Sequence, residues 1–310
     1  LSLLVWRAAP KEMDNRFISI LLIVEGLKAS YMIPSLLPAD YADWWWLSQY
    51  TILLRGNIFQ TAHIISILMY LCFPIYFRVN ALRFLYRPVL QKYAWYMPLI
   101  ITTVYMGIQI LQNNPGHMIQ NFAFIECSAV GAAPTIDVVV GSQIGIMDEM
   151  VTSIGTCEGV YSFPIANGGE IGFLLVALSY LISILALFVM RTSMKEYNNA
   201  ENADSSKSLT SRSLYIGFLG KVIGTTLFFM MLFFITPMLN PIKDGPNLFV
   251  DSYTVQYMGA TLQGKLFGYS MTLNGYLLSL PIAFEAMMFV HAMMKDTVLG
   301  IDERLRKTFS

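Results

Sequence analysis

The sequence predicts an all-α protein, a polytopic membrane helix bundle with seven spans, its amino terminus outside and its carboxyl terminus inside. Of the 310 residues, 55% are hydrophobic and 13% are charged, whereas soluble domains carry roughly 25% charged residues. Apolar runs of membrane length, about 20 residues each, recur along the chain. The connections between these runs are alternately rich and poor in Lys and Arg, which is the pattern that the positive-inside rule describes.

The placement of charge sets the expected orientation. Fifteen of the twenty Lys and Arg residues fall in four stretches, and three other stretches hold two basic residues against ten acidic ones. We therefore expect the basic connections on the cytoplasmic side of a plasma membrane and the acidic ones outside. The net charge is zero, so nothing favours nucleic acid as a partner, and membrane lipids are the expected surroundings. The basic stretches are 7–16, 78–92, 191–212 and 295–310, and the acidic ones are 38–46, 113–170 and 240–265.

Each apolar run is taken as one span. The first run ends at Trp6, and we expect it to be the cytoplasmic end of a helix that begins before this sequence. Six complete spans follow, and together they form a transmembrane bundle over residues 1–294. Residues 295–310 are charged and predict a cytoplasmic amphipathic tail. The expected spans are 16–37, 47–77, 93–112, 169–190, 213–239 and 266–293.

Two connections have a character of their own. The outer loop 113–168 contains no Lys or Arg and is too long for a simple connection, so we expect it to fold on itself. Within it, the run TIDVVV at 135–140 predicts one strand of a small hairpin. The polar stretch 196–213 predicts a mobile cytoplasmic linker.

Charged residues inside the expected spans are the first candidates for a functional site, because each costs at least ~2.5–3.5 kcal/mol at a helix centre. Glu25, Lys221 and Glu285 lie about eight or nine residues from the cytoplasmic ends of the second, sixth and seventh spans. Equal depth predicts an intramembrane charge cluster of these three residues. The cluster would be a switch, a proton site or a ligand anchor, or else a structural ion pair between helices.

A second set of polar residues predicts a cavity that opens to the outside. Asn57, Gln60 and Thr61 follow i, i+3, i+4 spacing, so they share one helix face. That face must point into the bundle or a water-filled cavity. The expected occupant is a small ligand from the outer side, and ordinary interhelical hydrogen bonding is the alternative. The predicted lining is Lys28, Arg55, Asn57, Gln60, His63 and Asn274.

The three cysteines divide into two groups. Cys127 and Cys157 lie in the outer loop, where a disulfide is chemically permitted. We expect this pair to be bonded, and the alternatives are two free thiols or a buried pair that never meets. Cys72 lies in an apolar run and is expected to be a small core residue.

Motifs for catalysis or metal binding are absent from the sequence. There is no CxxC or HExxH, and no Walker or GxSxG motif. The three histidines, His63, His117 and His291, fall at different depths and do not form a ligand set. We therefore expect no metal, no cofactor and no enzymatic activity.

The last span continues into MFVHAMMKDTVLGIDERLRKTFS, in which an apolar helix is followed by a short charged connection and a basic stretch. This arrangement is similar to the end of the seven-transmembrane sensor region of bacterial and archaeal histidine kinases. The matching residues are Leu299, Ile301, Asp302, Leu305, Arg306 and Thr308. The segments VWRAAPKEMDNRFISILL and RPVLQKYAWYMPLIITTVYMG resemble the first inner loop with the second helix, and the entry to the fourth, of that region.

The resemblance implies a membrane sensor that passes a signal to an output domain following residue 310. The sequence holds no phospho-accepting histidine segment and no ATP-binding glycine motif. The leading hypothesis is thus a seven-helix sensor or receptor-like module for signal transduction. The alternatives are a non-catalytic subunit of a larger membrane complex, packed on partner membrane subunits, and a small transporter or channel.

Overall fold

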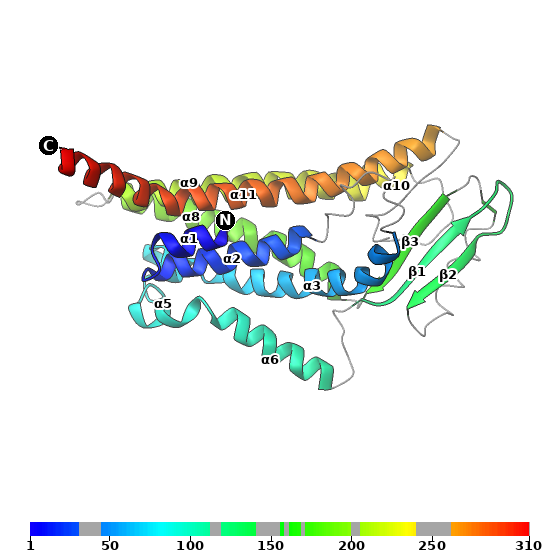
Figure 1. Ribbon diagram of the computed structural model, residues 1–310, viewed down its shortest axis with the longest axis horizontal. Coiled ribbons are helices and arrows are strands. Elements are labelled where there is room, and N and C mark those ends of the chain that lie inside the picture. Colours follow the sequence, from blue (N-terminus) through cyan, green and yellow to red (C-terminus); the bar gives the residue numbers. More distant parts are fainter. Residues whose placement is uncertain are drawn as a thin grey trace.

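A computed structural model of the chain describes eight stretches, and the account below is confined to them. They are residues 1–30, 45–111, 119–140, 156–157, 161–168, 171–199, 205–239 and 262–309. Helices dominate, and they run side by side along the long axis of the molecule, with a small sheet at one end (Figure 1). We call that end the sheet end. The opposite end, where α5 lies and α8 and α9 meet, is called the basic end.

The first half of the helical bundle contains the helices up to residue 111. The short helix α1 (Ser2–Ala8) packs on α2 (Met13–Ser30), and α2 packs on α3 (Trp45–Leu71). A connection at the basic end then leads to α6, which lies apart from most of the bundle (Figure 1). The elements of this half after α3 are α4 (Phe73–Tyr76), η3 (Asn80–Leu82), α5 (Pro88–Ala94) and α6 (Met97–Leu111).

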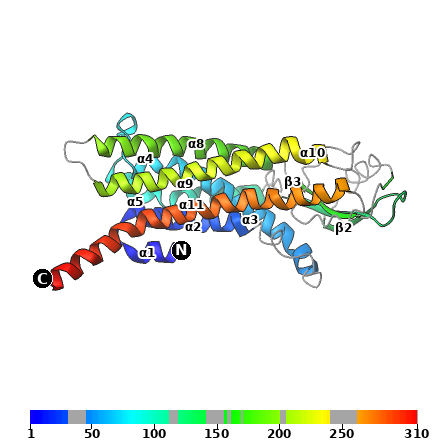
Figure 2. The ribbon, with the colours of Figure 1, turned by 90° about the horizontal axis from the view of Figure 1, so that it is seen from above.

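Three long helical segments form the second half of the bundle. α8 (Ile171–Asn198) packs on α9 (Ser205–Met230), and α9 packs on α11 (Leu262–Phe309). A π-helical turn, η4 (Met231–Ile235), joins α9 to α10 (Thr236–Leu239) without a break in the helical path. α11 runs from the sheet end past the basic end, where its carboxyl-terminal part leaves the other helices (Figure 2).

Four helical segments are long and apolar enough to cross a membrane: 57–76, 177–198, 207–239 and 273–294. Their outward faces keep large apolar side chains in the open. Leu181, Leu185 and Phe188 on α8, for example, are each more than half exposed. Extended apolar surface of this kind is rare on soluble monomers and suits contact with lipid. The fold is thus that of a helical membrane protein.

The described part of residues 113–168 forms a three-stranded antiparallel sheet, which corrects the all-α prediction. β1 (Ile119–Cys127) lies between β2 (Thr135–Val140) and β3 (Tyr161–Gly168). The predicted strand 135–140 is confirmed as β2. Pro164 lies in β3, an outer strand of this sheet, where a residue without an N–H is tolerated.

One further expectation about elements was wrong. The polar stretch 196–213 is not a linker over most of its length, because α8 continues to Asn198 and α9 begins at Ser205. The expected tail 295–310 is helical in its described part, residues 295–309, and continues α11 without interruption. In both places the helix propagates beyond the apolar run, since one backbone hydrogen bond is gained for each residue added.

Close approach of α9 to α11 depends on glycines. A Cβ at Gly217 would lie 3.1 Å from Met288 Cβ and from the Phe289 ring. A Cβ at Gly220 would overlap the ring of Phe284, and one at Gly224 would overlap Pro281. Small residues let membrane helices pack backbone to backbone, so this stripe holds the two helices together.

An aromatic layer fills the bundle on the basic-end side of its middle. The Phe218 ring centroid lies 5.0 Å from that of Phe73 and 5.2 Å from that of Phe289, both in edge-to-face geometry. Phe17 of α2 completes the layer, 5.2 Å from Phe73. All four side chains are fully buried. Edge-to-face pairs of this kind add about 0.5–1.5 kcal/mol each beyond area burial.

A buried charge cluster as the candidate functional site

Four helices meet at a cluster of charged side chains in the middle of the bundle. Glu25 and Lys28 come from α2, Lys221 from α9 and Glu285 from α11. Glu285 is fully buried, and the exposed fractions of the other three are 5% or less. α3 adds Ser66 and Tyr70, which are also buried. We call these six residues the charge cluster.

Lys221 lies at the centre of the charge cluster. Its ammonium nitrogen is 3.0 Å from Glu25 Oε2 and 2.8 Å from Glu285 Oε2, and it also contacts the Tyr70 hydroxyl. The structure therefore brings together Glu25, Lys221 and Glu285, which were predicted to form a cluster because they lie at equal depth. The Lys221–Glu285 contact lacks hydrogen-bond alignment, and Glu285 Oε2 accepts no hydrogen bond from a described residue.

Lys28 was expected at an outer cavity, and this expectation was wrong. Its ammonium group is 3.0 Å from Glu25 Oε1, and it donates a hydrogen bond to Ser66 Oγ at 3.1 Å. Lys28 follows Glu25 by three residues, so both side chains lie on one helix face. The flexible stem of Lys28 lets its charge reach back to Glu25.

Tyr70 joins the two carboxylates, and the sequence reasoning missed it. Its hydroxyl donates to Glu25 Oε1 at 2.6 Å, and Glu285 Oε1 lies 3.3 Å from the Tyr70 hydroxyl oxygen. A phenol has one proton, so at any moment Tyr70 can donate to only one of the two acids. The available signal was a tyrosine hydroxyl near the inner end of an apolar span, since a buried tyrosine hydroxyl needs a hydrogen-bond partner.

The charges of the cluster balance, with two carboxylates and two ammonium groups. Burial of such a set costs desolvation energy that the ion pairs do not necessarily recover. The ion pairs of the cluster join α2, α9 and α11, and the Tyr70 hydroxyl adds α3. Among the described residues, no group of three His, Cys, Asp or Glu side chains could hold a metal ion.

Apolar layers close the cluster on both sides. The aromatic layer of Phe17, Phe73, Phe218 and Phe289 separates it from the basic end. Toward the sheet end, Phe59, Phe228 and Leu278 pack into a second buried group. The charge cluster is thus enclosed, which strengthens the electrostatic coupling among its members.

Other residues of the predicted polar face and cavity make hydrogen bonds within α3 or between α10 and α11. His63 is buried and donates from Nδ1 to the carbonyl of Phe59 at 2.9 Å. Asn274 Nδ2 donates to Thr236 Oγ1 at 2.9 Å, linking α11 to α10. Thr61 Oγ1 donates to the Asn57 carbonyl at 2.7 Å.

Two buried amide oxygens in this region, Gln60 Oε1 and Asn274 Oδ1, have no hydrogen-bond partner among the described residues. The side chain of Arg55 lies outside the described part of the structure. Of the predicted cavity residues, Lys28 thus belongs to the charge cluster, His63 bonds within α3, and Asn274 joins α11 to α10.

The structure describes the side chains of two of the three cysteines, Cys72 and Cys157. Cys157 is disulfide-bonded, and Cys72 is a free thiol. The side chain of Cys127 lies outside the described residues. Cys157 also pairs through its main chain with the turn after β1, donating to the Ala132 carbonyl at 2.8 Å and accepting from Gly131 at 2.7 Å. This residue is therefore anchored at the sheet end by its backbone as well as its sulfur.

No protein-family model, curated protein or solved structure matches the chain.

Proposed function

We propose that the chain is the seven-helix membrane part of a sensor or receptor-like module. In this proposal the packing of helices around the charge cluster has two states, and α11 carries the difference to the basic end. The observation that carries the proposal is the continuity of α11. Glu285 is buried in the charge cluster, and the same helix extends without a break to Phe309.

The seven spans of the proposal are α1, α2, α3, α6, α8, α9 with α10, and α11. Beyond the four segments of clear membrane length, α1 is the end of a span and α2 and α6 are short apolar spans. The basic end faces the cytoplasm and the sheet end faces outward, as the distribution of Lys and Arg favours. This orientation and the sensor role agree with the resemblance to the sensor region of histidine kinases.

The contacts of the cluster suit a switch with two arrangements. Tyr70 has one proton to share between Glu25 of α2 and Glu285 of α11. Lys221 contacts both acids at nearly equal distances. A small shift of α11 relative to α2 would exchange partners without leaving a charge unpaired. A stimulus can act on such a pair of states only by favouring one of them.

The enclosure of the cluster supports this role over that of a channel or transporter. Apolar layers lie on both of its sides, whereas a conduction path needs continuous polar or wetted surface.

Distance measurements across the basic end test the proposal. In the Cys72→Ser background, spin labels at Lys195→Cys on α8 and Arg304→Cys on α11 would report the α8–α11 distance in lipid nanodiscs. We expect two populations, whose ratio changes between dimyristoyl and dioleoyl phosphatidylcholine and between wild-type and Glu285→Gln proteins. One distance population that neither the lipid nor the substitution alters would contradict a two-state sensor.

A non-catalytic subunit of a membrane complex is the second candidate, and α6 favours it. This helix contacts mainly α3 and α5, and it leaves Ile101, Val104 and Leu111 each more than half exposed. Apolar faces of this extent suit a partner helix as well as lipid. Native mass spectrometry of the protein released from its own membranes would distinguish the candidates, because a subunit is expected to leave the membrane with partner chains.

A further inference from the structure

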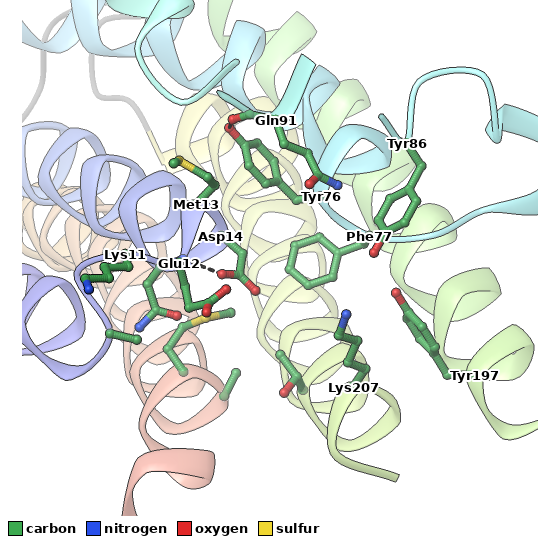
Figure 3. A pocket seen from close by; sticks show the side chains of 15 residues that line it. Lys11, Glu12, Met13, Asp14, Tyr76, Phe77, Tyr86, Gln91, Tyr197 and Lys207 are labelled. Carbon is green, nitrogen blue, oxygen red and sulfur yellow. Dashed lines mark hydrogen bonds between the residues drawn. The ribbon is translucent and has the colours of Figure 1, made fainter. Parts of the chain in front are cut away.

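A cavity of about 410 Å³ lies at the basic end (Figure 3), and Ala292 and Met293 of its lining follow Phe289 of the aromatic layer along α11. Its walls come from the α1–α2 connection, the α4–α5 region, α8, α9 and α11. The volume falls within the range of small-molecule sites. The residues that matter for its chemistry are Glu12, Asp14, Tyr76, Phe77, Tyr86 and Lys207.

One side of the cavity is acidic. Asp14 and Glu12 carry their carboxylates toward each other at the start of α2 (Figure 3). Asp14 Oδ1 accepts a hydrogen bond from the backbone of Asn15 at 2.9 Å, and Asp14 forms no salt bridge with a described residue. Burial raises the pKa of Asp14, and the charge of Glu12 adds to the rise, which outweighs the lowering by the Asn15 backbone hydrogen bond and by the charge of Lys207. A positively charged ligand would stabilise the ionised form of this partly buried carboxylate.

Aromatic rings face this acidic side. The ring of Phe77 lies beyond Asp14 in the cavity, and Tyr86 and Tyr197 follow it (Figure 3). Tyr76 is fixed by two contacts, since its hydroxyl donates to the Gln91 carbonyl at 2.9 Å and its ring stacks on Phe17 at 4.5 Å. Aromatic faces attract cations, and they do so more strongly where water is excluded.

We propose that this cavity binds a small organic ammonium ion from the aqueous phase at the basic end. The ammonium group would lie against Asp14 and Glu12, and the apolar part of the ligand against Phe77 and Tyr86. A carboxylate combined with aromatic rings supplies both attractions that such a cation needs.

An anionic ligand fits the cavity less well. Lys207 lies on the opposite side from Asp14, and the ammonium group of Lys11 points away from the rings (Figure 3). Both lysines are exposed, and so is Glu12, so water and salt screen these three charges, whereas the half-buried Asp14 is screened less. An anion in the cavity would have to approach the two carboxylates at the start of α2.

The cavity also reaches the moving part of the proposed sensor. Ala292 and Met293 of α11 line it, about two helical turns beyond Glu285. The binding proposal itself does not depend on the sensor role, because it rests on the cavity and its charges alone.

Three ligands of one shape provide the test. Benzylammonium, benzyl alcohol and benzoate share a ring and differ in charge. Their binding to the full chain in phosphatidylcholine nanodiscs would be followed by ligand-observed NMR, with empty nanodiscs subtracted. We expect saturable binding of benzylammonium, with benzyl alcohol and benzoate at least tenfold weaker.

Variants assign the binding to the cavity. Asp14→Asn should weaken benzylammonium binding at least tenfold, Asp14→Glu should keep most of it, and Tyr86→Leu should weaken it severalfold. Asp137→Asn in β2, at the sheet end, removes the same charge far from the cavity and should change nothing. Preferred binding of benzoate, equal binding of all three ligands, or benzylammonium binding that Asp14→Asn leaves intact would each overturn the proposal.

Discussion

At the scale of single residues, the charge cluster depends on a balance that one substitution breaks. Lys221 contacts Glu25, Glu285 and Tyr70 at once, so its ammonium group compensates two buried acids. Lys28 compensates Glu25 but has no described contact with Glu285. Glu285 therefore depends on Lys221 for its counter-charge.

Replacing Lys221 with Met should destabilise the protein by about 3–5 kcal/mol, because a buried acid then loses its partner. Adding Glu285→Gln to Lys221→Met should recover part of that loss. The free energy of unfolding in mixed micelles measures both effects, and Lys265→Met at an exposed site is the matched control. Strictly additive effects of the two substitutions would show that the residues do not interact.

Asp14 makes the stability of the protein depend on pH. Burial raises the pKa of Asp14 above its ordinary value of 3.8, so the folded state binds this proton more tightly than the unfolded state. The contribution of Asp14 to stability then falls as the pH rises from about 3.8 through the raised pKa. Its charged neighbours at the cavity are Lys11, Glu12 and Lys207.

Asp14→Asn should therefore raise the melting temperature at pH 7, and the gain should shrink as the pH falls toward 4. Thermal unfolding in detergent across this range, with Asp137→Asn as the control, measures the effect. A gain that is independent of pH would assign the stabilisation to something other than the charge of Asp14.

The sequence allowed part of this chemistry to be predicted. Counting residues from the ends of the spans placed Glu25, Lys221 and Glu285 at one depth, because the rise of a helix is fixed. The same count misplaced Lys28, since depth along the axis ignores how far a long side chain reaches along it. Tyr70 was missed because a search for charge overlooks a neutral hydroxyl.

At the scale of helices, the close contact between α9 and α11 depends on glycines, which have no side chain. Gly217 and Gly224 bracket Lys221 on α9, and their partners Phe289 and Pro281 bracket Glu285 on α11. The backbones therefore come close on both sides of the Lys221–Glu285 ion pair, which fixes its length.

Gly224→Ala should cost about 1–3 kcal/mol, because the new methyl group overlaps the rigid ring of Pro281 and must push the helices apart. Gly107→Ala in α6 is the control, since a Cβ there has nothing within 4 Å, and it should not lower stability. Unfolding in mixed micelles compares the two. Equal effects at both glycines would mean that α9 and α11 are not held at this distance by Gly224.

Hydropathy predicted the long helices but not the residues at which they end. α8, α9 and α11 all continue into polar sequence. Polar residues are compatible with a helix that is anchored by its packed apolar part, so a change in composition does not mark a change in backbone structure.

At the scale of the whole molecule, the two ends differ in structure and in charge. The sheet end carries β1, β2 and β3, and the basic end carries the cavity of Figure 3. Of the sheet, only β2 was predicted, because its run of β-branched residues is the clearest strand signal. β1 and β3 contain Gln, Asn, Pro and Gly, which weaken that signal.

Reporters placed at the two ends test the orientation. A fluorescent protein inserted after Asn199 should fold in the cytoplasm, and alkaline phosphatase inserted after Val130, in the exposed turn between β1 and β2, should be active outside. Exchanging the two reporters should silence both. Activity of one reporter type at both positions would place the two ends in the same compartment and refute the proposed topology.

The length of α11 has a mechanical consequence. Its 48 residues extend over about 72 Å, far more than the roughly 40–45 Å of a whole bilayer. The 24 residues that follow Glu285 form an arm of about 36 Å. If the ion pair with Lys221 acts as the pivot, a tilt of about 10° would swing the tip of this arm by about 6 Å, so an ångström-scale rearrangement deep in the lipid would become a displacement large enough for another protein to detect.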